Sequence, residues 1–296
     1  MKKILYEKRK EPDNFVPANF LNDLKKNVFI RKYSLSRVIC EAGVFFQQIC
    51  CIEIFLCAHI YGYWKLYSVE NLLGFSFSIC LLAYLMNFLL NSYSNFWKDV
   101  RLYFVICFFT FLLCPLLHSL MISVSDDTVY ALTALFLLIN FLTYNYKCSI
   151  VTDISSYLLE PGPDTLSLTS GLLASLCLSS RYSNPLGTFL TVLNALHIFG
   201  FWPSFARTLR KLFGIKAQAA LTGILFILSS FMGANLVSNC VKSDPQDCAP
   251  VYTGTMIAFQ LVSLIFINFI CPLLLCSNIC HKQNIHGPWD EAVITG

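Results

Sequence analysis

Charged residues are scarce in this 296-residue sequence. Asp, Glu, Lys and Arg together make up 13% of it, where about a quarter is typical of soluble domains. Hydrophobic residues make up 56%, and 26 of them are Phe. The sequence also lacks the ten-residue alternation that is typical of a membrane β-barrel, because its apolar stretches are unbroken runs of about 20 residues. These features exclude an ordinary soluble domain and predict an all-α fold, that of a polytopic helical membrane protein.

Common catalytic and metal-binding motifs are missing as well. The sequence contains no HExxH, GxSxG, GxGxxG, Walker lysine, DxD or CxxC pattern. No standard hydrolase, nucleotide, sugar-transferase or zinc site can therefore be placed in it. His59, His118 and His197 occur singly in apolar surroundings, which is more typical of packing residues than of ligands. We therefore expect no catalytic residue, metal site, cofactor or nucleic-acid partner in this chain.

Apolar runs predict about eight transmembrane helices, with six to eight as the range that the pattern allows. The fifth is short, and only three residues separate it from the sixth, so the two form either a tight hairpin or a partly re-entrant pair. We divide the chain into a basic leader (residues 1–37), a transmembrane bundle (38–277) and a tail (278–296). The predicted helices are 38–62, 70–91, 99–121, 127–147, 165–180, 184–203, 217–240 and 252–277.

The first predicted span carries polar residues that lipid would penalise: Glu41, Gln47, Gln48 and Glu53. Helical spacing places Glu41 and Gln48 on one stripe. We interpret the span as an interior helix whose polar face contacts other helices, a subunit or a lipid headgroup. The alternative is that Glu41 lies at the interface and the glutamines form interhelical hydrogen bonds.

The leader is polar and basic, so we expect no cleavable signal peptide and expect the first span to act as the targeting signal. After Pro17 the pattern predicts an amphipathic helix in the cytosolic headgroup layer. Docking of this helix against a soluble partner is the competing interpretation. Four basic residues are candidates for binding the interface and an anionic lipid: Lys25, Lys26, Arg31 and Lys32.

The distribution of positive charge predicts the orientation. Eight spans place 18 of the 21 Lys and Arg residues on one side, and such a bias predicts that both termini are cytosolic. The loop that contains Cys240 and Cys248 then faces the oxidising lumen, where the two cysteines are candidates for a disulfide.

Two further stretches could carry a function. Asp126-Asp127 opens the fourth span: we favour helix capping by Ser125 and the carboxylates over the alternative, a catalytic pair in a lipid-linked sugar transferase.

The tail bends at a Gly-Pro pair and then presents an aromatic residue and two acids. It predicts a docking segment for a partner, and packing against the chain's own loops is the alternative. Its candidate residues are His286, Trp289, Asp290 and Glu291.

With these residues in view, nearly the whole chain resembles the PIG-C family, the C subunit of phosphatidylinositol N-acetylglucosaminyltransferase. The sequence departs from the family pattern in a shorter connection around residues 92–98 and in the Cys240/Cys248 loop. The resemblance is most specific in Ser123–Ala131 and in the NIHGPWDEA tail, and it extends through Leu5-Tyr6-Glu7, Pro12-Asp13-Asn14, Arg31-Lys32-Tyr33, Glu41, Gln47-Gln48, Thr165–Leu168, Ala174-Ser175, Cys177-Leu178, Ser180-Arg181 and Trp202-Pro203.

The resemblance implies a multi-pass protein of the endoplasmic-reticulum membrane. Its complex would transfer N-acetylglucosamine from UDP-GlcNAc to phosphatidylinositol, the first step of GPI-anchor biosynthesis. It also implies that a separate catalytic glycosyltransferase subunit performs the chemistry. This chain would be a scaffold that binds this and other membrane subunits, and a candidate binder of the phosphatidylinositol acceptor among the membrane lipids. A small transporter or lipid scramblase that uses Glu41, Gln48 and Glu53 is the alternative hypothesis.

Overall fold

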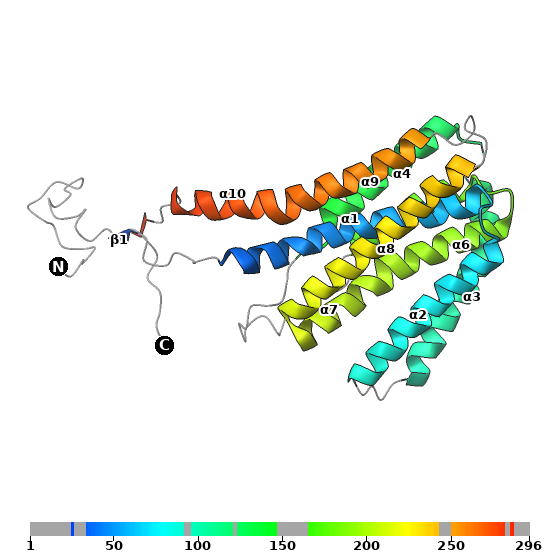
Figure 1. Cartoon of the computed structure of the whole chain (residues 1–296). Coiled ribbons are helices and arrows are strands. Elements are labelled where there is room, and N and C mark those ends of the chain that lie inside the picture. The colour runs from blue at the N-terminus through cyan, green and yellow to red at the C-terminus, as the bar shows by residue number, and fades with distance from the viewer. Residues whose placement is uncertain are drawn as a thin grey trace, which may run out of the picture. The chain divides into compact units, whose positions relative to one another are not determined.

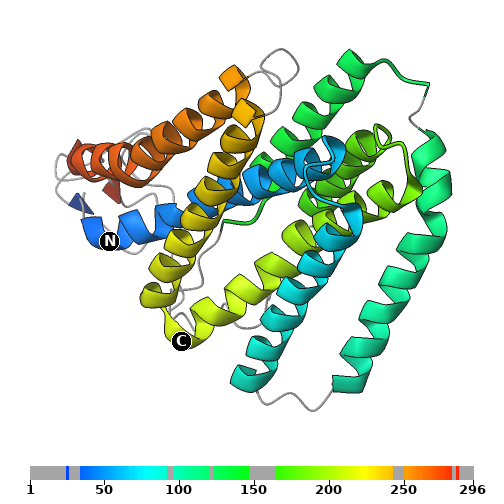
Figure 2. The ribbon, with the colours of Figure 1, turned by 45° about the vertical axis from the view of Figure 1, so that its right-hand side comes forward.

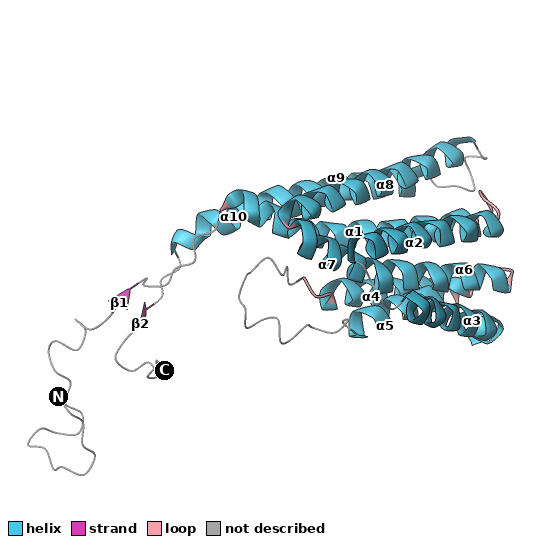
Figure 3. Cartoon of the chain, turned by 90° about the horizontal axis from the view of Figure 1, so that it is seen from below, coloured by secondary structure: helices cyan, strands magenta, loops and turns pink. Residues whose placement is uncertain are grey.

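The computed structural model describes residues 25–26, 34–91, 96–120, 123–146, 165–242, 250–281 and 285–286. It divides into two compact units, one formed by Ser36–Pro272 and the other by Met1–Leu35 with Leu273–Gly296. Helices account for nearly all of the described residues (Figure 3). The predicted class, a polytopic helical membrane protein, is therefore confirmed.

The helices begin and end close to the predicted positions, because long apolar runs bounded by polar turns determine them. Within the described residues, seven helices are long and apolar enough to cross a membrane, and α5 is an apolar helix of 15 residues. The elements are α1 (Leu35–Tyr63), α2 (Val69–Asn91), α3 (Phe96–Leu120), α4 (Asp126–Thr143), α5 (Thr165–Ser179), α6 (Pro185–Ala195), π-helix η3 (Leu196–Phe201), α7 (Trp202–Phe213), α8 (Ile215–Lys242), α9 (Pro250–Ile265), π-helix η4 (Phe266–Ile270), α10 (Cys271–Asn278) and 3₁₀-helix η5 (Ile279–His281).

Helix α1 lies at the centre of the larger unit, as its polar residues predict (Figures 1 and 2). On one side its Phe55 packs with Leu137 of α4 and Phe199 of η3. On another side its Phe46 packs with Leu225 of α8. Half of the apolar window of α1 is buried in this unit. The interpretation of the first span as an interior helix is thus confirmed.

Helix α5 packs closely on α4 and α6 through small residues. Ser170, Gly171, Ala174 and Ser175 are all buried, and small side chains let helices approach closely in a membrane. A Cβ added to Gly171 would lie 2.7 Å from a ring carbon of Phe199 and 3.2 Å from Asn140 Nδ2. This glycine is therefore required by the close approach of η3 and α4 to α5.

The predicted spans leave residues 204–216 between the sixth and seventh helices as a cytosolic loop, but the structure shows helices there. α6, η3 and α7 form one continuous helical run from Pro185 to Phe213, and α8 begins at Ile215. Gly214 alone separates α7 from α8, with φ of +64°, a conformation that favours glycine. Three of its basic residues, Arg207, Arg210 and Lys211, lie on the amphipathic helix α7, and Lys216 lies on α8.

The smaller unit contains a two-stranded antiparallel pair. β1 (Lys25–Lys26) pairs with β2 (Ile285–His286), so that Lys25 lies opposite His286 and Lys26 opposite Ile285. The predicted amphipathic helix is wrong at Lys25 and Lys26, because pairing with the tail gives their backbone groups hydrogen-bond partners outside a helix. The rest of that predicted helix, up to residue 33, lies outside the described residues.

Candidate functional site: a polar seam and a basic cavity

A buried hydrogen-bond network of Gln48, Asn140 and Ser167, which we call the polar seam, joins three helices of the larger unit. Gln48 Nε2 of α1 donates to Asn140 Oδ1 of α4 at 2.7 Å. Asn140 Nδ2 in turn donates to the Ser167 carbonyl oxygen of α5 at 2.6 Å, and Ser167 Oγ donates to the Asn140 carbonyl oxygen at 3.2 Å. Since an unpaired amide in an apolar interior is costly, this network fixes α1, α4 and α5 in one register.

The neighbouring glutamine joins α1 to a fourth helix. Gln47 Nε2 donates to the Gln218 carbonyl oxygen at 3.3 Å and to Thr222 Oγ1 at 2.9 Å, both on α8. Gln47 and Gln48 therefore point to different sides of α1 and hold different helices. Both glutamines are buried and form the interhelical hydrogen bonds that the sequence analysis gave as an alternative.

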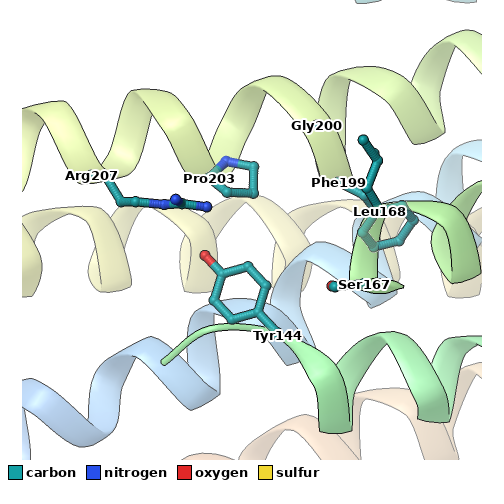
Figure 4. Close-up of a pocket in the computed structure, with 7 residues that line it drawn as sticks. All are labelled: Tyr144, Ser167, Leu168, Phe199, Gly200, Pro203 and Arg207. Carbon is teal, nitrogen blue, oxygen red and sulfur yellow. The ribbon is translucent and has the colours of Figure 1, made fainter. Parts of the chain in front are cut away.

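A small cavity lies beside this seam, at the end of the unit where α4 ends and α5 begins. It encloses about 20 Å³, room for about one water-sized group. Figure 4 shows the Arg207 side chain of α7 and the Tyr144 hydroxyl pointing toward one another across it. Its lining residues are Tyr144, Ser167, Leu168, Phe199, Gly200, Pro203 and Arg207.

Two arginines of α7 concentrate positive charge here. Arg207 is half-buried, and Arg210 is only 9% exposed. Burial raises the pKa of Tyr144, although the positive charges of Arg210 and Arg207 oppose this rise. Tyr144 thus stays protonated and able to donate. None of the described carboxylates lies within 4 Å of either arginine.

An ion pair lies at the opposite end of the bundle from the cavity, where α4 begins. Arg181 Nη1 lies 2.7 Å from Asp126 Oδ1, and Arg181 Nη2 donates to the Val124 carbonyl oxygen at 2.5 Å. Ser125 is the N-cap residue of α4, but its side chain caps no backbone N–H. The prediction of hydroxyl capping is therefore wrong: Ser125 Oγ instead lies 3.0 Å from Thr128 Oγ1, and Asp126 ties the α3–α4 connection to the α5–α6 turn.

The three single histidines pack against neighbouring side chains: two contact other helices, and His59 contacts its own helix and the α5–α6 turn. His197 of η3 bridges two of them, with Nδ1 2.8 Å from Ser76 Oγ of α2 and Nε2 2.9 Å from Tyr103 Oη of α3. His118 Nδ1 of α3 lies 3.4 Å from Thr188 Oγ1 of α6. His59 stacks on Tyr63 and accepts, at its carbonyl oxygen, a 2.9 Å hydrogen bond from Tyr182. All three therefore act as packing residues, as their apolar surroundings predict.

The other predicted site residues do not form one cluster. Glu41 pairs with Arg37 at 3.6 Å, one turn away on α1, and both side chains are well exposed. Glu53 is half-buried, and its Oε1 has no partner among the described atoms. Lys25, Lys26 and His286 lie in the β1–β2 pair. Six further predicted positions lie outside the described residues: Arg31, Lys32, Cys248, Trp289, Asp290 and Glu291. For Cys240, the structure describes the backbone but not the side chain.

Sequence reasoning missed the residues that gather around the cavity. Asn140 is a lone amide in an apolar run, which marks a helix–helix contact. Arg207 and Arg210 were missed because residues 204–216 were predicted as a loop. Tyr144 was missed because it meets Arg207 only in the folded structure. Among the described residues, no group of three or more His, Cys, Asp or Glu is placed to hold a metal ion.

Taken together, the fold and this site define a polytopic helical membrane protein whose buried polar groups join helices. A family model described as phosphatidylinositol N-acetylglucosaminyltransferase matches residues 1–290. The chain belongs to this family.

Individual relatives agree with the family match. The chain is 32% identical to the C subunit of phosphatidylinositol N-acetylglucosaminyltransferase from Rattus norvegicus and from Homo sapiens, over 99% of this chain and 92% of each relative. It is 29% identical to the GPI2 subunit of the same transferase from Schizosaccharomyces pombe, over 99% of this chain and 86% of that protein. No solved structure matches the chain.

Proposed function

We infer that this chain is the membrane subunit of a phosphatidylinositol N-acetylglucosaminyltransferase complex, which starts GPI-anchor biosynthesis. The observation that carries this inference is similarity along the whole chain: the family model covers residues 1–290, and the rat and human relatives match over 99% of this chain. The substrates are then UDP-GlcNAc and phosphatidylinositol, and the site of action is the endoplasmic-reticulum membrane.

Within the complex, the chain is a scaffold that binds a catalytic glycosyltransferase subunit and other membrane subunits. The use of its interior polar groups supports this role, since Gln47, Gln48 and Asn140 are all engaged in helix–helix hydrogen bonds. The transporter hypothesis gains no such support, because Gln48 is bonded to Asn140 and Glu41 is paired with Arg37.

Co-purification combined with an activity assay tests the scaffold role. In this proposal the tail docks a partner, since an aromatic residue with flanking charges is a common interface hot spot. Removing residues 284–296 should reduce the recovery of partner subunits, and activity should fall in proportion to the assembled fraction. Asp290→Asn is the companion variant. A fully assembled complex that this change leaves about a hundredfold less active, the loss expected for a general acid or base, would contradict the scaffold role.

Both termini are cytosolic in this proposal. The β1–β2 pair supports the placement of both termini on one side, because residues before α1 and after α10 can pair only if an even number of crossings separates them. The excess of Lys and Arg supports the cytosolic side. Because the described residues contain seven helices long and apolar enough to cross, the proposal requires α5 to cross as the eighth. An N-glycosylation acceptor inserted within residues 243–248 should be glycosylated, and the same insertion at residue 155 should not. Glycosylation at residue 155 would refute this topology.

Two smaller proposals concern other predicted residues. A luminal loop would let Cys240 and Cys248 form a disulfide, and mass measurement after alkylation without reduction should find neither thiol free.

The basic residues Lys25, Lys26, Arg31 and Lys32 would strengthen contact with anionic lipid by on the order of 1 kcal/mol each. Reversing all four charges should therefore weaken acceptor binding; normal assembly and acceptor affinity would show that they act only as a spacer.

A further inference from the structure

The cavity at the end of the bundle brings together three kinds of group that bind anions. Arg207 supplies a guanidinium, and Tyr144 supplies a hydroxyl that stays protonated. The third contribution comes from α5, whose first turn lines the cavity through Ser167 and Leu168. The first N–H groups of a helix have no partner within the helix, and the helix dipole makes this end attractive to negative charge.

The positive charge at this site has no counterpart among the described residues. Arg210 is more than nine-tenths buried and has an Nε atom without a hydrogen-bond partner in the described structure. The described carboxylates lie more than 4 Å from both arginines. Because burying a charge without a partner is costly, such an arrangement suits an anion that comes from outside the larger unit.

The length of the α6–α7 run places Arg207 near the lipid phosphates. Arg207 lies 22 residues after Pro185, where this run begins, which corresponds to about 33 Å along a helix. The hydrocarbon core of a bilayer is about 30 Å thick. With Pro185 at one boundary of the core, Arg207 therefore lies just beyond the other boundary, in the headgroup layer.

We propose that this cavity binds the phosphate group of an anionic phospholipid. Arg207 and the Tyr144 hydroxyl donate to one non-bridging phosphate oxygen. Arg210 does not line the cavity; it adds positive potential beside it. The cavity admits only a phosphate oxygen, so the rest of the headgroup stays outside, while Leu168, Phe199 and Pro203 offer an apolar wall to the lipid. The identification of this lipid as the phosphatidylinositol acceptor rests on the proposed function.

The test uses the full chain purified together with its partner subunits in neutral detergent. The shift in melting temperature is measured against increasing short-chain phosphatidylinositol, with short-chain phosphatidylcholine, inositol 1-phosphate and UDP as comparison probes. Phosphatidylinositol should stabilise the wild type most, because inositol 1-phosphate lacks the acyl chains that contact the apolar wall. Arg207→Gln should weaken phosphatidylinositol binding by about tenfold or more, the loss expected for a hydrogen bond to a charged group.

Three variants control for charge, geometry and stability. Lys211→Gln removes an exposed positive charge from the same helix and should change binding by less than about twofold. Tyr144→Phe should weaken binding less than Arg207→Gln does, and Arg207→Lys should restore part of it, because a lysine keeps the charge but loses the bidentate geometry.

The possible results separate failure of the site from failure of the proposed function. If Arg207→Gln lowers the melting temperature without lipid and leaves the lipid-induced shift unchanged, the arginine pairs with a carboxylate of the protein and the site is refuted. Equal losses for Arg207→Gln and Lys211→Gln would show general surface attraction and would also refute it. If Arg207→Gln weakens the binding of UDP or inositol 1-phosphate but not that of phosphatidylinositol, the phosphate does not come from a lipid and the proposal is refuted. Failure of the wild-type chain to co-purify with a glycosyltransferase subunit would instead refute the proposed function.

Discussion

Helix α1 and helix α2 are equally apolar but lie in opposite environments. The mean hydropathy of the best window is 1.6 in both, yet half of that window is buried in α1 and only 6% in α2. α3 has a higher mean hydropathy of 2.2, and again only 6% of its window is buried. In this protein, hydropathy therefore shows that a helix crosses the membrane but not whether the helix lies inside the bundle.

Polar residues distinguish the two environments. Lipid is as apolar as leucine, so burying apolar surface gains little within a membrane, and packing and hydrogen bonds decide which helices associate. α1 carries Gln47 and Gln48, which bond to three other helices directly or through Asn140. α2 and α3 share one polar contact point in η3, where Ser76 and Tyr103 both meet His197.

The largest expected effect comes from the same substitution made in both environments. Phe55 of α1 is 1% exposed and packs edge-on against Phe199, with ring centroids 5.4 Å apart. Phe55→Ala leaves a cavity and should lower the free energy of unfolding by about 3–5 kcal/mol. Phe108→Ala, at a residue of α3 that is 52% exposed, should change it by less than about 0.5 kcal/mol, because lipid or detergent fills the space. Denaturation in mixed micelles measures both; equal losses would remove the distinction between the helices.

The next effect concerns the polar seam. Asn140→Leu removes the hydrogen bonds to Gln48 and Ser167 and should cost about 1–2 kcal/mol, since single hydrogen bonds between membrane helices average about 0.6 kcal/mol. In a double-mutant cycle, Asn140→Leu with Gln48→Leu should cost less than the sum of the two single changes. Additive losses would mean that the two side chains do not stabilise each other.

Most of the fold could be predicted from the sequence because apolar length determines where membrane helices begin and end. The predicted span 38–62 became Leu35–Tyr63, and 70–91 became Val69–Asn91. The prediction failed where a helix continues beyond the apolar core: α7 is amphipathic, and its arginines were taken as loop residues. The β1–β2 pair could not be predicted either, because two-residue strands far apart in the sequence leave no periodic pattern.

The candidate site was less predictable than the fold. Gln47 and Gln48 stood out because amides are rare in an apolar run, but their partners depend on how helices rotate against one another. Tyr144 and Arg207 lie 63 positions apart and meet only in the folded structure. A periodic pattern in the sequence identifies the residues on one helix face; it does not show which residues of other helices they contact.

A smaller and local effect is expected at the contact that holds α2 and α3. His197→Phe removes the hydrogen bonds to Ser76 and Tyr103 while keeping an aromatic ring that stacks on Tyr103. The cost should be about 1 kcal/mol, so amide exchange in α2 and α3 should rise about fivefold, with little change in α4 and α5. Ser76→Ala removes the contact with His197 and also the 2.7 Å hydrogen bond that Ser76 Oγ donates to Asn194 Oδ1, so it should cost about as much. A uniform rise in all helices would show that His197 supports the whole bundle and not only its edge.

The smallest expected effect lies within α1 itself and compares Glu41 with Gln48. The sequence placed both on one polar stripe, but Glu41 pairs with Arg37 one turn away, and the two side chains are 38% and 51% exposed. Exposed pairs at this spacing contribute about 0.3–0.5 kcal/mol. Glu41→Gln should therefore lower the free energy of unfolding by no more than about 0.5 kcal/mol, and Arg37→Gln should have an equal effect that does not add to it. If Glu41→Gln costs more than about 1 kcal/mol in the assembled complex but not in the isolated chain, Glu41 contacts a partner protein. The polar face of α1 would then extend from the interior of the bundle to an interface between proteins of the complex.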